Sequence, residues 1–495
     1  MAHTVLLDNI ETRHYINGAF SCSSDGATFQ LESPYSHEKI ADVSEASIED
    51  TNRAVAAAKA AFAAWSNLDI PTRGGYMRKM AILIREASQE LAQLDALSMG
   101  RPISSYFDAN YAAEQMDHYA EAGWEARGET SLNTPGFVNM TFRQPYGPVA
   151  IIIPWNIPVA MWASRVAPAL AAGCTVVLKS SEKAPLSSAK LAALAHRAGF
   201  PPGVINVLSG HGTPCGSTLA SHMDIRVINF TGSSATGRLV QAAASSSNLK
   251  KVILELGGKS PTLVFDDVDI EGVTADMAKS VLFNSGQTCM ASTRIYVQES
   301  IAESFMSAFV KIFSAARKGD PLNPNTEIGP QADKKQFEQI KAYLATARFD
   351  ATSKLLTGGR ASHEAGDGGY FIEPTAYCHV AENAKTQREE IFGPFVNINV
   401  FKTESEAIKK ANATEYGLYA SVYTKDLSRA LRVAKAFESG FVGVNCTSPT
   451  SPPDMPFGGY KCSGQGREGL GHSLSEYLEF KSVVVKLETT ATNVD

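Results

Sequence analysis

Short apolar runs alternate with amphipathic segments through the middle of the chain. The runs are rich in Val and Ile and cover residues 149–153, 175–178, 204–208, 226–230 and 252–254. Segments with helical periodicity, such as 187–198 and 235–245, separate them. Strands that are apolar on both faces and joined by helices predict a parallel sheet covered by helices. Ligands of such sheets bind at the carboxyl ends of the strands, so the residues that follow each run are candidates for a site.

A second series of the same kind begins near residue 260. Its strand candidates are residues 262–265, 294–297, 371–372, 395–401 and 441–445, and helical patterns at 301–317 and 334–347 lie between them. The N-terminal third is mostly helical, with one helix from Ser47 to Trp65 and another over 72–99 that Gly100 stops. No long linker divides the chain, so we expect the two α/β units to share an interface.

Composition narrows the class of protein. The 495 residues favour two or three domains, and only 19% are charged, against a usual share of about 25%. A net charge of −6, with no Lys/Arg run longer than a pair, argues against a nucleic-acid surface. The apolar stretch at 148–155 is far shorter than the ~20 residues of a membrane helix. Neither residues 1–4 nor residues 492–495 resemble a targeting signal, so we expect none.

The cysteines indicate a compartment. There are seven, an odd number without a Cys-x-x-Cys pair, which fits a reduced, cytoplasmic protein better than a disulfide framework. No two Cys or His residues have the spacing of zinc ligands, so we expect no metal site.

Cys289 is the first candidate for chemistry. An isolated cysteine is most often a small buried hydrophobe. Here the preceding residues are Asn284-Ser285-Gly286-Gln287-Thr288, a polar, turn-rich approach that favours a sulfur facing a cleft. A nucleophilic thiolate needs such access.

Glu255 stands between two leucines at the end of an apolar run, where burying a charge is costly. One interpretation is an ion pair with Lys250, Lys251 or Lys259. The other is a carboxylate with a raised pKa that acts as a general base.

Two further turns follow apolar runs. Asn156, after Pro154-Trp155, is either a turn or capping residue or an amide donor to a developing oxyanion. The turn from Gly232 to Gly237 lacks the Lys and Ser/Thr of a phosphate-binding P-loop. Its Gly232-Ser233 start still offers backbone donors and a helix N-terminus to a pyrophosphate.

Lys179 and Glu182 follow the run at 175–178. They are either a solvated pair on a loop or a pair that holds the hydroxyls of an adenosine ribose. A carboxylate at that place would repel a 2′-phosphate and so favours NAD over NADP.

Six motifs in this order give the chain a family resemblance. They are Pro154-Trp155-Asn156, Phe230-Thr231-Gly232-Ser233, Leu254-Glu255-Leu256-Gly257-Gly258-Lys259, Gly286-Gln287-Thr288-Cys289, Glu390-Ile391-Phe392-Gly393-Pro394 and Pro456-Phe457-Gly458-Gly459-Tyr460-Lys461-x-Ser463-Gly464. From about Tyr15 to Lys481 the chain resembles the NAD(P)-dependent aldehyde dehydrogenases of the hydrolytic, non-acylating type. The resemblance implies a Rossmann-like parallel-sheet cofactor domain, a second α/β catalytic domain and a small β oligomerisation hairpin.

The resemblance also implies roles for the motif residues. Cys289 would be the nucleophile, Glu255 the general base, and Asn156 with the backbone N–H of Cys289 the oxyanion hole. The cofactor would be NAD, with NADP possible, and its contacts would be Trp155, Lys179, Glu182, Gly232, Ser233, Glu390 and Phe392. The reaction would pass through a thiohemiacetal and a thioester, which water activated by Glu255 hydrolyses to a carboxylic acid. Glu255 therefore argues against an enzyme that transfers the acyl group to coenzyme A.

The substrate and the assembly are expectations of the same kind. An apolar channel lined by Ile157, Met161, Ser164, Thr288, Met290 and Phe457 favours an apolar or aromatic aldehyde. The NAD-binding domain would comprise residues 1–123 and 146–257, the catalytic domain 258–463, and the oligomerisation segment 124–145 with 474–495. Residues 130–138 and 141–143 have the alternation of hairpin strands, with a Pro-Gly turn, so we expect a homodimer or homotetramer.

Two other functions fit parts of the sequence. A cofactor-independent cysteine hydrolase or acyltransferase would use Cys289 and needs a His to activate it, but no His lies near the motifs. A catalytically silent scaffold would keep the fold without the reaction, although all three chemical residues are present.

Overall fold

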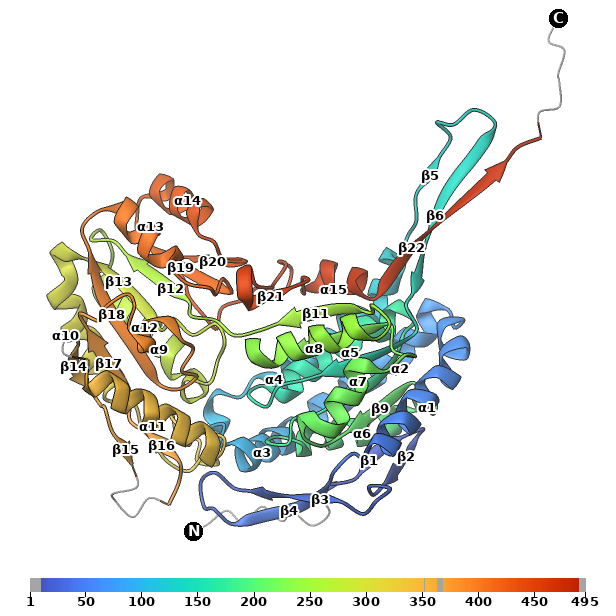
Figure 1. Cartoon of the computed structure of the whole chain (residues 1–495), viewed down its shortest axis with the longest axis horizontal. Helices are drawn as coiled ribbons and strands as arrows, with labels where there is room; N and C mark the ends of the chain where they lie inside the picture. Colours follow the sequence, from blue (N-terminus) through green and yellow to red (C-terminus); the bar gives the residue numbers. More distant parts are fainter. Residues whose placement is uncertain (1–9, 351, 363–367, 489–495) are drawn as a thin grey trace, which may run out of the picture.

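The computed structural model describes residues 10–350, 352–362 and 368–488, and the termini considered for targeting signals lie outside them (Figure 1). Two α/β bodies lie side by side, and a three-stranded arm projects from one of them. Each body is built on a mainly parallel sheet, which confirms the predicted α/β fold. Among the described residues no helix is long and apolar enough to cross a membrane.

The first sheet contains the five strands predicted from the apolar runs. Its order in the described chain is β2 (Ala19–Ser21), β1 (His14–Ile16), β9 (Ile205–Leu208), β8 (Thr175–Lys179), β7 (Pro148–Ile152), β10 (Val227–Thr231), β11 (Lys251–Glu255) and β21 (Gly464–Gln465). The strands from β9 to β11 are parallel, and β1 and β21 add antiparallel edges. The late strand β21 brings the C-terminal part of the chain back to the first body.

Helices cover both faces of this sheet. They are α1 (Ile48–Ser66), α2 (Ile70–Glu86), α3 (Ser88–Met99), α4 (Asp108–Ala122), α5 (Pro158–Ala172), α6 (Leu186–Ala198), α7 (Ser217–Ser221) and α8 (Ser234–Ser246). Val149 and Ile151 pack with residues of α2, α4, α5 and α6, whereas Ala150 and Ile152 pack with α1 and α8 on the other face. This alternation is the period of two that a strand buried on both faces requires.

The predicted helix over 72–99 is two helices. Ala87 leaves the helical conformation at φ −89° and ψ 7°, and α2 ends before it while α3 begins after it. Both helices contact α4 and α6, but α2 packs mainly against α4, whereas α3 makes much smaller contacts with α6 and α4. The predicted start at Ser47 and stop at Gly100 were right: Ser47 forms a capping box with Asp50, and Gly100 stops α3 at a left-handed φ of 79°. The second helix begins at Ile70, two residues before the predicted start.

The second sheet has the order β14 (Lys354–Thr357), β17 (Thr375–Cys378), β18 (Phe395–Phe401), β13 (Arg294–Gln298), β12 (Pro261–Val264), β19 (Tyr419–Tyr423) and β20 (Phe441–Val444) in the described chain. Its helices are α9 (Ile270–Leu282), α10 (Ala302–Phe313), α11 (Lys334–Arg348), α12 (Lys385–Arg388), α13 (Glu404–Asn412) and α14 (Leu427–Ala436). The sequence analysis missed β14, β17 and β19. It also placed 371–372 in this sheet, but β16 (Phe371–Ile372) pairs with β15 (Ala361–Ser362) in a separate ribbon. The predicted helix 301–317 ends earlier, at Phe313.

The arm joins distant parts of the sequence. In it β6 (Phe137–Pro145) lies between β5 (Thr130–Ser131) and β22 (Leu478–Lys486), and β22 pairs with β6 along its whole length (Figure 1). The predicted turn at Pro135-Gly136 is present, with Gly136 at φ 79°. A short ribbon of β3 (Thr28–Glu32) and β4 (Lys39–Ser44) and the helix α15 (Leu470–Glu476) complete the described strands and α-helices.

Candidate active site

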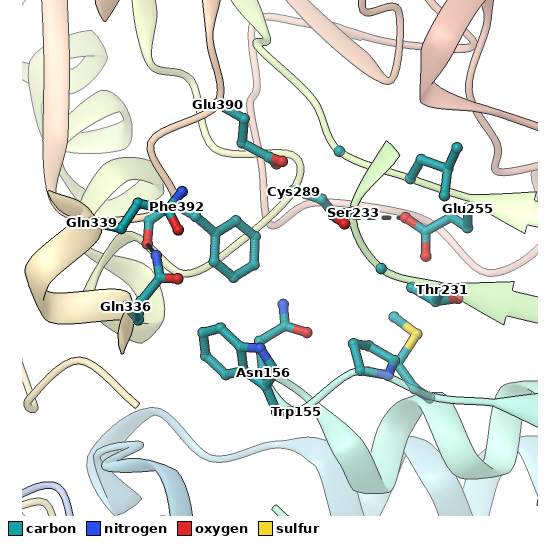
Figure 2. Close-up of a pocket in the computed structure, with 15 residues that line it drawn as sticks. Trp155, Asn156, Thr231, Ser233, Glu255, Cys289, Gln336, Gln339, Glu390 and Phe392 are labelled. Atoms are coloured by element: carbon teal, nitrogen blue, oxygen red, sulfur yellow. Dashed lines mark hydrogen bonds between the residues drawn. The ribbon is translucent and has the colours of Figure 1, made fainter. Parts of the chain in front are cut away.

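Two cavities of the described chain meet at Cys289. One, of about 190 Å³, is lined from the first body by Trp155, Asn156, Gly232, Ser233 and Glu255 and from the second by Glu390 and Phe392 (Figure 2). The other, of about 180 Å³, is mostly apolar. Asn156, Met161, Glu255 and Cys289 line both cavities. The residues from β7, β10 and β11 lie at the carboxyl ends of those strands, as expected for a parallel sheet.

Cys289 follows a strained loop. Asn284, Ser285 and Gly286 have φ of 49°, 57° and 76°, a left-handed conformation that is unfavourable for the first two. The hydroxyl of Ser285 donates to the carbonyl of Gly329 at 2.9 Å, and the amide of Asn284 donates to the backbone oxygen of Asn156 at 2.8 Å. A Cβ on Gly286 would collide with the backbone of Gly393. The loop is therefore held in one position, with the nucleophile candidate at its end.

The thiol of Cys289 contacts Glu255 directly. Sγ donates to Oε1 of Glu255 at 3.4 Å. Burial raises the pKa of the Cys289 thiol well above its usual value, and the nearby carboxylates of Glu255 and Glu390 raise it further. The thiol is therefore protonated at neutral pH in this arrangement, and Glu255 is the group in reach that can accept its proton.

Glu255 forms an ion pair, but with a residue that the sequence analysis did not consider. Its Oε2 lies 3.1 Å from Nη2 of Arg165, and the same nitrogen lies 2.7 Å from Oε1 of Glu468. Burial raises the pKa of Glu255, and the charge of Arg165 opposes this rise. The pKa of Glu468 is raised to about 7 by burial, again against Arg165.

The lysines proposed as partners of Glu255 have other contacts. Lys250 donates to the carbonyl of Ala220 at 2.7 Å, and Lys251 pairs with Glu476 at 2.6 Å. Lys259 is buried and makes no ion pair or side-chain hydrogen bond with the described residues. The predicted ion pair with a neighbouring lysine is therefore wrong, and the cation is supplied from α5.

Asn156 is held against the nucleophile loop. Its Nδ2 donates to the carbonyl of Gln287 at 2.9 Å, two residues before Cys289. An amide nitrogen carries two donors, and the second has no partner among the described residues. The backbone N–H of Cys289 also has no hydrogen-bond acceptor in the described chain. Two donors are thus free beside the sulfur.

The residues predicted to bind a dinucleotide line the first cavity, apart from two. Ser233 caps α8, with its hydroxyl accepting from the backbone N–H of Thr236 at 3.3 Å. Phe392 has a φ of 61°, and its carbonyl accepts from the side chain of Gln336 at 2.9 Å. Its ring meets that of Trp155 edge to face, with centroids 5.3 Å apart.

The set of donors and acceptors fits a dinucleotide. The first backbone N–H groups of α8 are available to an anion at the cavity wall. Oε1 of Glu390 accepts from the N–H of Gly258 at 3.0 Å, while Oε2 has no partner in the described chain. A Cβ on Gly257 would collide with this carboxylate, so the glycine allows the close approach. Burial raises the pKa of Glu390 to about 7.

Lys179 and Glu182 do not line this cavity. Lys179 is buried, which contradicts the interpretation as a solvated pair, and its Nζ donates to the carbonyl of Ser180 at 2.9 Å. Glu182 lines a separate hollow. The next residue, Lys183, has its Nζ 5.0 Å from the centre of the Trp155 ring, so this segment passes beside the first cavity.

The second cavity contains the predicted channel residues. Its lining includes Ile157, Met161, Ser164, Thr288, Met290 and Phe457. Phe107, Tyr111 and Phe283 also line it, as do three prolines of the loop before Phe457. The sequence analysis named no aromatic residue of α4.

Arg165 and Glu468 are the main residues that the analysis missed. Arg165 is the single charged residue in α5, whose other residues are mostly apolar. A single charged residue in a helix that is otherwise mostly apolar was the signal from which Arg165 could have been predicted as a site residue. Glu468 had no comparable signal, since it lies in a loop of mixed composition. The backbones of Glu468 and Phe457 exchange two hydrogen bonds of 2.7 Å, which fixes the carboxylate beside the channel. Gln336 and Gln339 also line the first cavity and were missed.

Comparison with known proteins identifies the family of the chain. The sequence model of the "Aldehyde dehydrogenase family" matches residues 21–483. An aldehyde dehydrogenase of Davidiella tassiana is 43% identical, with 96% of this chain and 95% of that protein covered. Retinal dehydrogenase 2 of Gallus gallus is 40% identical, over 97% of this chain and 93% of that protein.

Solved structures give the same result. A putative aldehyde dehydrogenase from Burkholderia cenocepacia superimposes with a TM-score of 0.95 at 37% identity, covering 97% of this chain and 99% of that one. A mutant of the P. syringae indole-3-acetaldehyde dehydrogenase AldA, solved with NAD+ and IAA, has a TM-score of 0.94 at 37% identity, with 97% of both chains covered. The predicted family is confirmed, and the NAD+ complex of this relative agrees with the predicted cofactor. The chain belongs to the aldehyde dehydrogenase family.

Proposed function

We propose that this protein oxidises an aldehyde to a carboxylic acid, with NAD as the cofactor and Cys289 as the nucleophile. The observation that carries the proposal is the position of Cys289. Its sulfur contacts a buried carboxylate at 3.4 Å, where the first cavity meets the apolar channel. A reacting carbon bound to that sulfur would lie at the junction of both spaces.

The first cavity would hold the dinucleotide. The N-terminus of α8 with Gly232 and Ser233 would bind the pyrophosphate, and the free oxygen of Glu390 would accept from ribose hydroxyls. Phe392 and Trp155 would bound the nicotinamide end and its surroundings. When bound, NAD supplies the acceptor for the hydride that leaves the substrate carbon.

The chain's own residues perform the addition. Glu255 accepts the thiol proton of Cys289 as the sulfur bonds to the aldehyde carbon, and the carbonyl oxygen becomes an alkoxide. The second N–H of Asn156 and the backbone N–H of Cys289 stabilise this alkoxide. Loss of hydride from the same carbon leaves a thioester on Cys289.

Hydrolysis completes the cycle. Glu255 first releases the thiol proton to solvent, which is the one net proton of the reaction. It then accepts a proton from a water molecule that attacks the thioester, and the carbon–sulfur bond breaks to release the carboxylic acid while this second proton returns to the sulfur of Cys289. Overall, one aldehyde, one NAD+ and one water give one acid, one NADH and one proton. Arg165 and Glu468 hold Glu255 during both proton transfers because they fix its second oxygen.

The channel favours a medium-sized apolar or aromatic aldehyde. Ile157, Met161 and Phe457 supply its apolar surface, and the small Ser164 leaves room on α5. Thr288 and Met290 flank the nucleophile and bound the space next to the reacting carbon.

An aldehyde panel tests the function. We expect NADH absorbance with benzaldehyde-type and short aliphatic aldehydes, a higher kcat/KM for the former, and a higher kcat/KM with NAD than with NADP. The Cys289→Ser variant should lose turnover while still gaining thermal stability from NAD. A strong preference for acetaldehyde would contradict the substrate class, and full activity of Cys289→Ser would contradict the nucleophile.

A cofactor-independent hydrolase is less consistent with the site. None of the described residues that line either cavity is a histidine, and the sulfur contacts a carboxylate that the oxidation also requires. Ester hydrolysis that is insensitive to NAD, without NADH formation from any aldehyde, would favour the hydrolase.

We also propose that the arm binds a second copy of the chain. Its strands expose Phe142, Phe480, Val484 and Val485, large apolar side chains that a monomer would leave in water. These side chains lie on both faces of the antiparallel ribbon, and an exposed ribbon of this kind is suited to a symmetric dimer or tetramer. The reduced, cytoplasmic location stays a prediction from the cysteine pattern.

A further inference from the structure

One face of α4 forms a wall of the apolar channel. Phe107, Tyr111 and Gln115 are spaced four residues apart, which places them on the same side of the helix, and all three line the channel. Helix α4 packs against α5, which carries Ile157 at its start and Met161 within it. The channel is therefore enclosed between two helices, with Cys289 at one end.

The start of this wall is a fixed aromatic surface. The ring of Phe107 lies 6.0 Å from Phe283 and 6.4 Å from Tyr111, between centroids. The guanidinium of Arg101 lies 5.3 Å from the rings of Phe107 and Phe283 and is itself buried and paired with Asp108 at 2.6 Å. Rings held in this way offer a flat face to a planar substrate.

Polar groups without partners interrupt this surface. Neither the hydroxyl of Tyr111 nor the side-chain amide of Gln115 makes a hydrogen bond with the described residues, although Gln115 is only 5% exposed. By contrast, the hydroxyl of Tyr119 on the same helix donates to the carbonyls of Gly469 and Leu470. Gln115 is buried, Tyr111 is half-buried, and both line the channel, so a ligand in the channel is the natural partner for their polar groups.

The charges of the lining restrict what that ligand can carry. Arg165 is the one cation among the described residues of the channel, and two carboxylates already engage it. A negatively charged substituent would meet Glu255 and Glu468 without a free cation. The partner of Tyr111 and Gln115 is therefore a neutral group that both donates and accepts.

We propose that the enzyme selects aromatic aldehydes that carry a hydroxyl group on the ring, bound by Tyr111 and Gln115. This inference rests on the proposed function and concerns the substrate of the same site. The phenolic hydroxyl donates to the amide oxygen of Gln115 and accepts from the hydroxyl of Tyr111. The ring lies against Phe107 and Phe283, and the aldehyde carbon reaches Cys289.

Selectivity follows from the cost of leaving buried polar groups unpaired. A site built to hydrogen-bond a substrate hydroxyl discriminates strongly against the analogue without it, because its own donors and acceptors then lose their partner. A purely apolar pocket would discriminate only weakly between the same two substrates.

The test compares ratios across variants. For wild type, Tyr111→Phe and Gln115→Met, kcat/KM is measured with NAD for benzaldehyde, 3-hydroxybenzaldehyde and 4-hydroxybenzaldehyde. Comparing the hydroxyl-to-unsubstituted ratio between variants cancels the intrinsic reactivity of each aldehyde. We expect each variant to lower the ratio for the better hydroxylated substrate about tenfold, the loss expected for one hydrogen bond. The prediction concerns the ratio alone, because both residues also line the channel that benzaldehyde occupies.

Controls separate the proposed selectivity for ring hydroxyls from the proposed oxidation of aldehydes. Glu114→Gln, on the exposed side of α4, should leave all ratios unchanged. A binding measurement without turnover, the Kd of 4-hydroxybenzoate and of benzoate for Cys289→Ser, should show the same loss when Tyr111→Phe is added. Equal ratios in all variants, with benzaldehyde still oxidised, would overturn this inference alone. No NADH from any aldehyde would overturn the proposed function.

Discussion

The sulfur of Cys289 and the carboxylate of Glu255 are in hydrogen-bond contact, with Sγ 3.4 Å from Oε1. The other oxygen of this carboxylate lies 3.1 Å from Arg165. The carboxylate of Glu255 therefore faces the thiol of Cys289 on one side and a fixed cation on the other. Because burial raises the pKa of both the thiol and the carboxyl, proton transfer between them is a transfer between groups that are both poorly solvated.

Replacing this carboxylate has two separable effects. Glu255→Gln removes the negative charge that helps to raise the pKa of Cys289, so the thiolate should form at lower pH than in the wild type. The pH profile of iodoacetamide alkylation measures this shift. Steady-state turnover should nevertheless fall by ~10²–10⁴-fold, because the base that activates water is lost.

The matched control is Glu271→Gln, an exposed carboxylate in α9, which should change neither quantity. If the alkylation profile of Glu255→Gln matched that of the wild type, the contact between Sγ and Oε1 would not exist in solution.

Substitutions of Arg165 and Glu468 should shift the acid limb of the activity–pH profile in opposite directions. Glu468→Gln removes a negative charge from the cluster, which favours the ionised form of Glu255 and lowers its pKa. Activity should then persist to lower pH. Arg165→Met removes the cation, raises the pKa of Glu255 and moves the acid limb to higher pH.

The measurement is kcat/KM against pH, which reports the free enzyme. If the acid limbs of both variants shifted in the same direction, the substitutions would be changing the local structure around Glu255 and not the charge beside it. Since Arg165→Met leaves two buried carboxylates without a cation, Arg165→Lys serves as the milder companion.

Local sequence signals were sufficient for much of the fold, and the family motifs were sufficient to name most residues that line the two cavities around Cys289. Five apolar runs became the parallel strands of the first sheet, and Ser47 and Gly100 were placed correctly as helix ends. Cys289 and Asn156, placed together by family resemblance, do lie together, with the amide of Asn156 bound to the loop of Cys289. Such features depend on neighbouring residues or on motifs that keep their order.

Features that depend on tertiary contacts were not predicted. The strand Tyr419–Tyr423 contains Ala and Ser between its aromatic residues, so its pattern is weak, and its burial between β12 and β20 makes it a strand. The partner of Glu255 comes from residue 165, ninety positions away. Nearby lysines were plausible from spacing, and only the packing of α5 against the sheet excludes them.

Cofactor choice can be tested at Glu182. This carboxylate follows β8, and its neighbour Lys183 lies over the ring of Trp155, so the segment borders the first cavity. Glu182→Gln removes a charge that would repel a 2′-phosphate, and the ratio of kcat/KM with NADP to that with NAD should rise about tenfold or more. The exposed Glu38→Gln is the control. An unchanged ratio would place the ribose away from this residue.

The proposal that the arm binds a second copy of the chain can be tested by substituting one apolar side chain. Val484 in β22 is 64% exposed, and Val484→Asp should weaken self-association because it would place a charge in a dimer interface. Light scattering coupled to gel filtration at several concentrations measures the change in mass. Leu427→Asp, at a similarly exposed residue of α14, should have no effect. Equal masses for the two variants would exclude the arm as the interface.

Asp95 should make the stability of the protein depend on pH. It is fully buried in α3, its Oδ2 accepts from the hydroxyl of Tyr106 at 3.4 Å, and its Oδ1 has no partner in the described chain. Burial and the nearby carboxylate of Asp108 raise its pKa from 3.8 to about 7, even though Arg101 lies close and pairs with Asp108.

The direction of the effect follows from proton binding. Between pH 3.8 and about 7 the folded protein holds a proton on Asp95 that the unfolded chain has lost, so the free energy of unfolding falls as pH rises through this range. Asp95→Asn stays neutral and lacks this fall. At pH 8.5 the variant should be more stable, by up to ~4 kcal/mol for a shift of about three pKa units, and have a higher Tm.

The difference should shrink at pH 5.5, where most of the native Asp95 is protonated. The exposed Asp42→Asn is the control and should leave the pH dependence of Tm unchanged. A variant that is less stable than the wild type at both pH values would mean that Asp95 is ionised in the folded protein and paired with Arg101. In that case the buried cation would serve two carboxylates in the first body, as Arg165 does beside Cys289.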